Sequence, residues 1–196
     1  MHNTVQKYKD IISAINRKIE EQKIFLTPKV IAVSKTFKLE KILPLIEYGH
    51  LDYGENKVQE AIDKWSAIKL KKTNIKIHLI GKLQTNKVKQ AVKIFDYIHS
   101  VDSTKLAKKI AYEQEKQGKN IKLFIQVNIG NEDQKSGVKV DHLNDLIDFS
   151  KKLKLNIIGL MCIPPANEEP DKYFKEIKLL NKKFNLSEIS MGMSSD

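Results

Sequence analysis

Lys35 is the residue of this sequence with the clearest potential for chemistry. It follows Ser34 and an apolar run at residues 30–33, so its amine is expected at the end of a buried strand. Loss of solvent disfavours a charged ammonium, and a neutral amine can attack an aldehyde to form a Schiff base. The alternative is a solvated loop lysine, which is the commoner fate of one lysine among many. Lys35 is therefore a candidate carbonyl-binding residue whose neighbours must support it.

Three other groups could contribute to the same site. Asn56 ends a Gly-Glu-Asn motif and could direct its amide at a ligand, or it could cap the next helix together with Gln59. His78 could donate to a ligand, or it could be a hydrogen-bonded core histidine. Small and hydroxyl residues at 190–196 suit a phosphate at a helix start, or a plain serine cap. No catalytic triad and no metal-ligand spacing has specific support, so no catalytic or metal residue is assigned.

The hydrophobic pattern predicts alternating helices and strands that would carry these residues on strand ends. A helical period opens the chain, with apolar side chains from Val5 to Ile19 on one face. Strands are predicted at residues 30–33, 51–53, 75–80, 97–101, 121–129, 157–161 and from 189 onwards. Helices are predicted at residues 39–48, from 58 through 65, 88–95, through 106–112, at 143–153 and at 173–184.

Repeated strand-helix units predict an α/β protein with a parallel sheet, either doubly wound or a barrel. The glycine-rich phosphate motifs of dinucleotide-binding and P-loop proteins are missing from the sequence, which favours a barrel of the (β/α)8 TIM type. In such barrels the functional residues lie at the C-terminal ends of the strands. The chain of 196 residues is long enough for one core, so a single domain over residues 1–196 is expected.

The basic composition does not by itself predict nucleic-acid binding. The net charge is +11, yet of the 35 basic residues only Arg17 is an arginine. Base and phosphate recognition favours the bidentate guanidinium, and the lysines here are interspersed with acidic residues. A solvated surface is therefore the expected role of the lysines, with charge-driven binding of RNA or acidic proteins as a rival.

Composition also bears on location and redox chemistry. No apolar run approaches the ~20 residues of a membrane-spanning helix, and the N-terminus has no signal-peptide pattern, so a cytoplasmic protein is expected. The single cysteine, Cys162, cannot form an internal disulfide or a cysteine-rich metal site. A buried thiol at a strand end is the expected role of Cys162.

Six motifs follow one another in a specific order. They are AVSKT at 32–36, GENKVQE at 54–60, HLIG at 78–81 with LQTNK at 83–87, QVNI at 126–129 leading to KSG at 135–137, GLM at 159–161 before IP at 163–164, and SMGMS at 190–194. Together they make the chain resemble the YggS/PROSC family of pyridoxal 5′-phosphate (PLP) homeostasis proteins across nearly its whole length.

The resemblance implies a single-domain barrel like the N-terminal domain of alanine racemase. It implies a monomeric PLP carrier without catalytic turnover, which holds PLP as a Schiff base on Lys35 and serves PLP-dependent apoenzymes. It places Asn56 near the cofactor ring and Met193 and Ser194 by the phosphate. A racemase-like or decarboxylase-like PLP enzyme of fold type III and a remnant with weak PLP binding are the alternatives.

Two departures from the family pattern qualify this expectation. Lys82 stands where the family usually has a proline, in a loop at the barrel mouth. Family members continue through another helix, an eighth strand and an Arg-Ile-Gly-Thr-like segment that helps to hold the phosphate. The sequence therefore predicts a barrel incomplete at its C-terminus, with about seven strands, unpaired edge amides, low stability and weak, mainly covalent PLP capture.

Overall fold

The computed structural model describes residues 2–132 and 134–192. In this part of the chain, strands and helices alternate from the N-terminal helix to the last strand. The strands are β1 (Ala32–Val33), β2 (Asp52–Glu55), β3 (Lys76–Leu79), β4 (Tyr97–Val101), β5 (Lys122–Gln126), β6 (Ile157–Cys162) and β7 (Glu188–Met191). The α-helices are α1 (Asn3–Glu21), α2 (Leu39–Glu47), α3 (Val58–Lys71), α4 (Val88–Ile94), α5 (Thr104–Gln117), α6 (Leu143–Lys152) and α7 (Pro170–Lys183).

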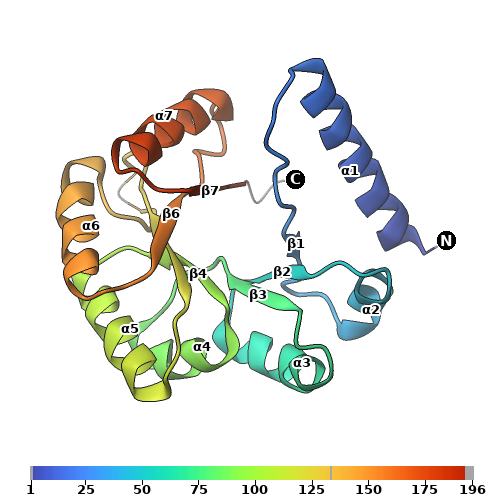
Figure 1. Cartoon of the computed structure of the whole chain (residues 1–196), viewed down its shortest axis with the longest axis horizontal. Helices are drawn as coiled ribbons and strands as arrows, with labels where there is room; N and C mark the ends of the chain where they lie inside the picture. Colours follow the sequence, from blue (N-terminus) through green and yellow to red (C-terminus); the bar gives the residue numbers. More distant parts are fainter. Residues whose placement is uncertain (1, 133, 193–196) are drawn as a thin grey trace.

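The seven strands form one parallel sheet in the order of the sequence, from β1 to β7. The sheet curls at the centre of the molecule, and the helices surround its outer face (Figure 1). Because each strand returns through a helix to pair with the next strand, the connections build a barrel-type wall. The prediction of an α/β barrel type with seven strands is confirmed. Within the described residues β1 and β7 are the two edges of the sheet.

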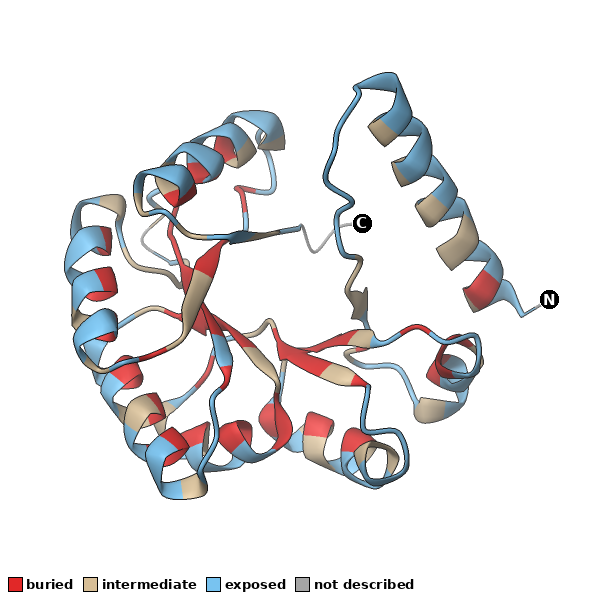
Figure 2. Cartoon of the chain, in the orientation of Figure 1, coloured by how far each residue is buried: buried red, intermediate tan, exposed pale blue. Residues whose placement is uncertain are grey.

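Strand β2 shows how the sequence sets the two faces of this wall. Tyr53 packs against Trp65 of α3 with ring centroids 4.7 Å apart, and Trp65 also donates a hydrogen bond to Glu55. Successive strand residues point to opposite faces, so Asp52 and Gly54 face the barrel interior. Most buried residues lie on the strands and on the helix faces turned toward them (Figure 2).

The N-terminal amphipathic helix forms as predicted, but its apolar stripe is only partly covered. Val5 is buried, whereas Ile11 is 51% exposed. Helix α1 packs mainly on α2, and Tyr8 contacts the rings of Tyr48 and His50. Periodicity identified the helix and could not show how much of its apolar face a neighbour would cover.

The element boundaries differ from the predictions where local backbone chemistry overrides the apolar pattern. Strand β1 pairs only over Ala32–Val33, and Lys35 lies in the turn that follows. Thr36 in this turn has φ 64°, in the left-handed region that β-branched residues rarely adopt. Helix α7 begins at Pro170, three residues earlier than predicted, because proline suits the first turn of a helix.

Candidate functional site

The candidate site lies where β1, β2 and β3 end. Lys35 lies two residues after β1 and Asn56 directly follows β2, and neighbouring parallel strands end on the same face of a barrel. Gly81, just after β3, approaches the backbone of Asn56 so closely that a Cβ atom would lie 2.4 Å from its carbonyl oxygen. Glycine is therefore required at position 81 for these strand ends to meet.

Apolar side chains surround Gly54 beneath these strand ends. A Cβ atom at Gly54 would lie 3.1 Å from Ile80 Cδ1, 3.2 Å from Ile31 Cγ2 and 3.6 Å from Val33 Cγ2. Val33 precedes Lys35 by two residues, so the apolar side chains around Gly54 lie just below the turn that carries the amine, and the polar His78 pairs in register with Gly54 on the next strand. The predicted apolar setting of Lys35 is consistent with this arrangement, and its role stays a prediction.

The residues on both sides of Lys35 are held by side chains from β2 and α3. Ser34 donates its backbone N–H to the Gly54 carbonyl (2.8 Å) and its hydroxyl to Glu55 Oε1 (2.7 Å). Lys64 donates to the Ser34 carbonyl at 2.7 Å. The N–H of Thr36 donates to Glu60 Oε1, also at 2.7 Å. Lys35 thus lies between two anchored residues.

The capping interpretation of Asn56 is wrong. Helix α3 begins at Val58 with Lys57 as its N-cap, and within the described chain no side chain caps it. The Gln59 amide donates to Asp63 instead of reaching back to the helix start. The turn after β2 brings Asn56 against Gly81, and α3 starts one residue too far along the chain for Asn56 to be its N-cap. Asn56 is half-buried at the strand end and stays a predicted ligand-binding residue.

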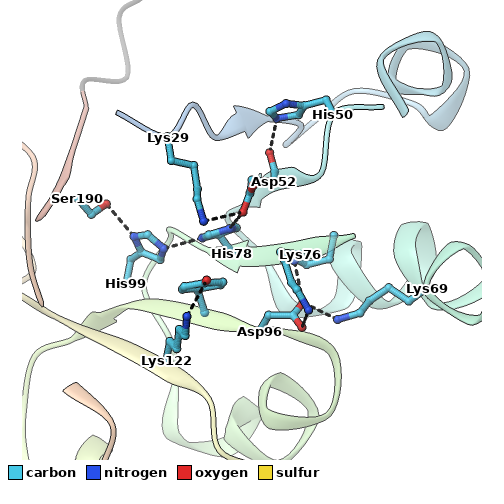
Figure 3. A network of polar contacts seen from close by, with 12 residues as sticks. Lys29, His50, Asp52, Lys69, Lys76, His78, Asp96, His99, Lys122 and Ser190 are labelled. Carbon is cyan, nitrogen blue, oxygen red and sulfur yellow. Dashed lines mark hydrogen bonds and ion pairs between the residues drawn. The ribbon is translucent and has the colours of Figure 1, made fainter. Parts of the chain in front are cut away.

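His78 belongs to a hydrogen-bonded network in the barrel interior (Figure 3). Its Nε2 lies 3.0 Å from Asp52 Oδ1, and its Nδ1 lies 3.0 Å from His99 Nε2. His99 Nδ1 in turn lies 2.7 Å from the hydroxyl of Ser190 on β7. The structure therefore shows the core-histidine alternative for His78, in a chain of contacts that links four strands.

The protonation states of Asp52, His78 and His99 determine which atoms of this network donate hydrogen bonds and which accept them. Burial alone would raise the pKa of Asp52, but the hydrogen bond from His78 and the Lys29 ammonium, 3.6 Å away, hold it below its usual range. Burial lowers the pKa of His78, and burial together with His78 lowers the pKa of His99 to about 3. Both histidines are therefore neutral at pH 7. An ionised Asp52 accepts from His78 Nε2–H, His78 Nδ1 accepts from His99 Nε2–H, and His99 Nδ1 accepts from Ser190.

Of the remaining residues singled out in the sequence, Ser190 and Cys162 lie within the described part of the chain. Ser190 lies within β7 and donates to His99, so it caps no helix. Met193 and Ser194 lie outside the described residues. Cys162 is the last residue of β6 and is fully buried, as predicted, and burial raises the pKa of its thiol to about 12. Among the described residues, no group of three or more His, Cys, Asp or Glu side chains could hold a metal ion.

Sequence reasoning missed the residues that anchor the Lys35 turn. Glu55 and Glu60 stand in the same motif as Asn56, and Lys64 follows Glu60 by four residues, a spacing that brings both side chains together on a helix. That spacing was a usable signal for the ion pair. The contact of the pair with residues beside Lys35 depends on how β1 and β2 align, which the motif alone does not encode.

Comparison with known proteins first defines the class. The family model for the alanine racemase N-terminal domain matches residues 12–196. An alanine racemase of Clostridium difficile 630 superposes with a TM-score of 0.67 at 12% identity, over 92% of this chain and 50% of that one, a likeness of fold alone. The fold, with its site on the strand ends, is thus the barrel of the alanine racemase N-terminal class.

More similar relatives narrow the class. A protein of Aquifex aeolicus (strain VF5), named pyridoxal phosphate homeostasis protein, is 37% identical over 178 residues, covering 86% of this chain and 77% of the relative. PipY of Synechococcus elongatus PCC7942, solved with PLP bound, has a TM-score of 0.73 at 32% identity and covers 93% of this chain and 90% of its own. The chain belongs to the pyridoxal phosphate homeostasis protein family, and the predicted resemblance is confirmed.

Proposed function

We propose that this protein binds PLP and takes part in intracellular PLP homeostasis, with Lys35 as the amine that captures the aldehyde. The observation that carries the proposal is the PLP-bound structure of the relative PipY, which matches almost all of this chain. The name of the Aquifex aeolicus relative supports the same function. Within this chain, the proposal is supported by a lysine held between two anchored residues at a strand end.

The donor set at the strand ends fits PLP. When bound, PLP supplies an aldehyde that condenses reversibly with a primary amine and releases water. Lys35 would provide that amine from the turn after β1, above the apolar side chains that contact Gly54. Asn56 would bind beside the ring from the end of β2. Met193 and Ser194 are proposed to hold the phosphate.

We further propose that PLP is stored and released instead of being used in catalysis. The homeostasis names of the relatives favour this role, and PLP-dependent apoenzymes in the cytoplasm are the proposed recipients of a monomeric carrier. Within the described residues, no helix is long and apolar enough to cross a membrane. An amino-acid racemisation assay with added PLP separates carrier from enzyme, because turnover above that of free PLP contradicts storage alone.

The binding proposal is tested by mixing the protein with PLP and dialysing it, for wild type, Lys35→Ala and Lys38→Ala. Lys38 lies three residues further on, at the start of α2, and serves as the matched control. We expect wild type and Lys38→Ala to retain the visible absorbance of lysine-bound pyridoxal and Lys35→Ala to lose it. Equal retention by all three proteins would reject Lys35 as the binding residue.

A further inference from the structure

We propose that Glu55, Glu60 and Lys64 form a clamp that positions Lys35 for the capture of PLP. The clamp fixes the backbone on both sides of Lys35 from a neighbouring strand and helix. The inference rests on the proposed function for its ligand, whereas the clamp itself is a property of the unliganded chain. These three residues are positioning residues, since each acts through Ser34 or Thr36.

Glu55 is the fixed point of the clamp. Its side chain is fully buried, and its Oε1 accepts from Ser34 Oγ at 2.7 Å, from Lys64 Nζ at 2.9 Å and from Trp65 Nε1 at 2.9 Å. Within the described residues its Oε2 is buried without a hydrogen-bond partner. Burying a carboxylate costs free energy unless ion pairs and hydrogen bonds compensate for the lost solvent, and an apolar residue would be enough if position 55 only had to pack. Glu55 therefore indicates a requirement for the contacts it makes, above all with Ser34.

Lys64 joins the two carboxylates and the backbone next to Lys35. Its side chain is only 9% exposed, and its ammonium donates to Ser34 O at 2.7 Å, to Glu55 Oε1 at 2.9 Å and to Glu60 Oε1 at 3.1 Å. An ammonium has three protons, so these three bonds use its full donor capacity. These bonds hold the Lys64 side chain in one conformation, so the Ser34 carbonyl is held in place by a residue of the rigid helix α3.

Glu60 holds the other side of Lys35. Its Oε1 accepts the N–H of Thr36 at 2.7 Å while also pairing with Lys64. The left-handed φ of Thr36 is unfavourable for a β-branched residue and persists only where the surroundings hold it. The Glu60 contact is one such restraint. The strained turn and the carboxylate therefore belong to one arrangement that sets the direction in which the chain leaves Lys35.

The consequence for capture is preorganisation. A lysine side chain has many rotamers, so fixing its backbone reduces the number of positions from which the amine can meet an aldehyde in the barrel mouth. Binding residues need support that holds them in a productive geometry, and loops supply it less well than helices and strands do. The clamp gives a turn residue the support of β2 and α3.

An ordinary helix ion pair offers the matched control. Lys109 and Glu113 on α5 have the same i,i+4 spacing as Glu60 and Lys64, with Nζ and Oε1 2.7 Å apart. Glu113, like Glu55, has a buried Oε2 without a partner among the described residues. Within the described residues, the hydrogen bond that joins the pair lies on α5 and involves no residue next to Lys35. Lys109→Met therefore removes a helix ion pair of the same spacing without touching the clamp.

The test uses Glu60→Ala, Glu60→Gln, Lys64→Met and Lys109→Met beside wild type. The first readout is amide hydrogen exchange at Ser34 and Thr36 in the unliganded protein. The second is the rate of PLP attachment to Lys35, trapped by borohydride and measured by peptide mass spectrometry. Glu60→Ala and Lys64→Met are expected to slow attachment about 10- to 100-fold and to speed exchange at Thr36. Glu60→Gln keeps an acceptor oxygen and should recover much of both.

Each outcome decides the proposal. Slower attachment in the two disrupting variants, rescue by glutamine and a wild-type rate in Lys109→Met would support the clamp. Attachment at the wild-type rate in Glu60→Ala and Lys64→Met, or equal slowing in Lys109→Met, would overturn it. If wild type itself attaches no PLP at Lys35, the proposed function fails, and exchange at Thr36 then decides alone whether the clamp exists.

Discussion

Acid should destabilise this protein through the buried His99. The pKa of His99 is about 3 in the folded state, whereas its ordinary value is 6.5. Between pH 6.5 and pH 3, His99 is therefore protonated in the unfolded chain and neutral in the folded chain. The contribution of the neutral His99 to the free energy of unfolding is therefore present above pH 6.5 and is lost as the pH falls from 6.5 toward 3. From these two values, His99 alone removes about 2 kcal/mol between pH 7 and pH 5.

The variant His99→Gln isolates this effect. Glutamine can still accept from Ser190 and donate to His78 but does not titrate, so the part of the difference in unfolding free energy between pH 7 and pH 5 that comes from His99 should disappear, whereas the contributions of the buried His50 and His78 stay. At pH 7 the variant should be less stable by about 1 kcal/mol, because its hydrogen bonds are imperfect.

Urea unfolding at each pH provides the assay. The single tryptophan, Trp65, is fully buried, so its fluorescence reports loss of the core. His142→Gln is the control, since it replaces an exposed histidine outside the buried network. A His99→Gln variant that keeps the full wild-type loss of stability between pH 7 and pH 5 would show that His99 is not its source.

Two further predictions concern the buried thiol and the strand ends. Cys162 should resist alkylation by iodoacetamide in the folded protein at pH 8 and react once urea unfolds it, because burial raises its pKa to about 12; rapid labelling without urea would contradict this. Gly81→Ala should cost about 1–3 kcal/mol in urea unfolding, because the new Cβ would lie 2.4 Å from the Asn56 carbonyl. Gly118→Ala is a useful comparison, since no atom lies within 4 Å of a Cβ there and only the left-handed backbone opposes it.

The order of elements was predictable because short apolar strands and amphipathic helices have different periods. Strand β4 begins and ends at the predicted residues, and the start of α6 was predicted correctly. Strand β1 was overestimated, because residues 30–31 are apolar without joining the ladder to β2. Apolar character marks where a strand can form, whereas pairing decides where it does.

The candidate site was predictable only where a motif names the residue. Lys35 and Asn56 came from motifs at strand ends, and the fold brings those ends together. The pairing of Asp52 with His78 and of His99 with Ser190 joins residues up to 91 positions apart, and the chain pattern holds no signal for such contacts. The histidines in otherwise apolar strands were the available hint.

The proposed role of Lys35 is tested most directly by the location of PLP on the chain. One arginine among 35 basic residues leaves 34 lysines that could react with an aldehyde. After incubation with PLP, borohydride reduction and proteolysis, mass spectrometry should find the pyridoxyl group predominantly on Lys35 at limiting PLP. Labelling spread over the exposed lysines, with no preference for Lys35, would show that Lys35 is not the PLP-binding residue.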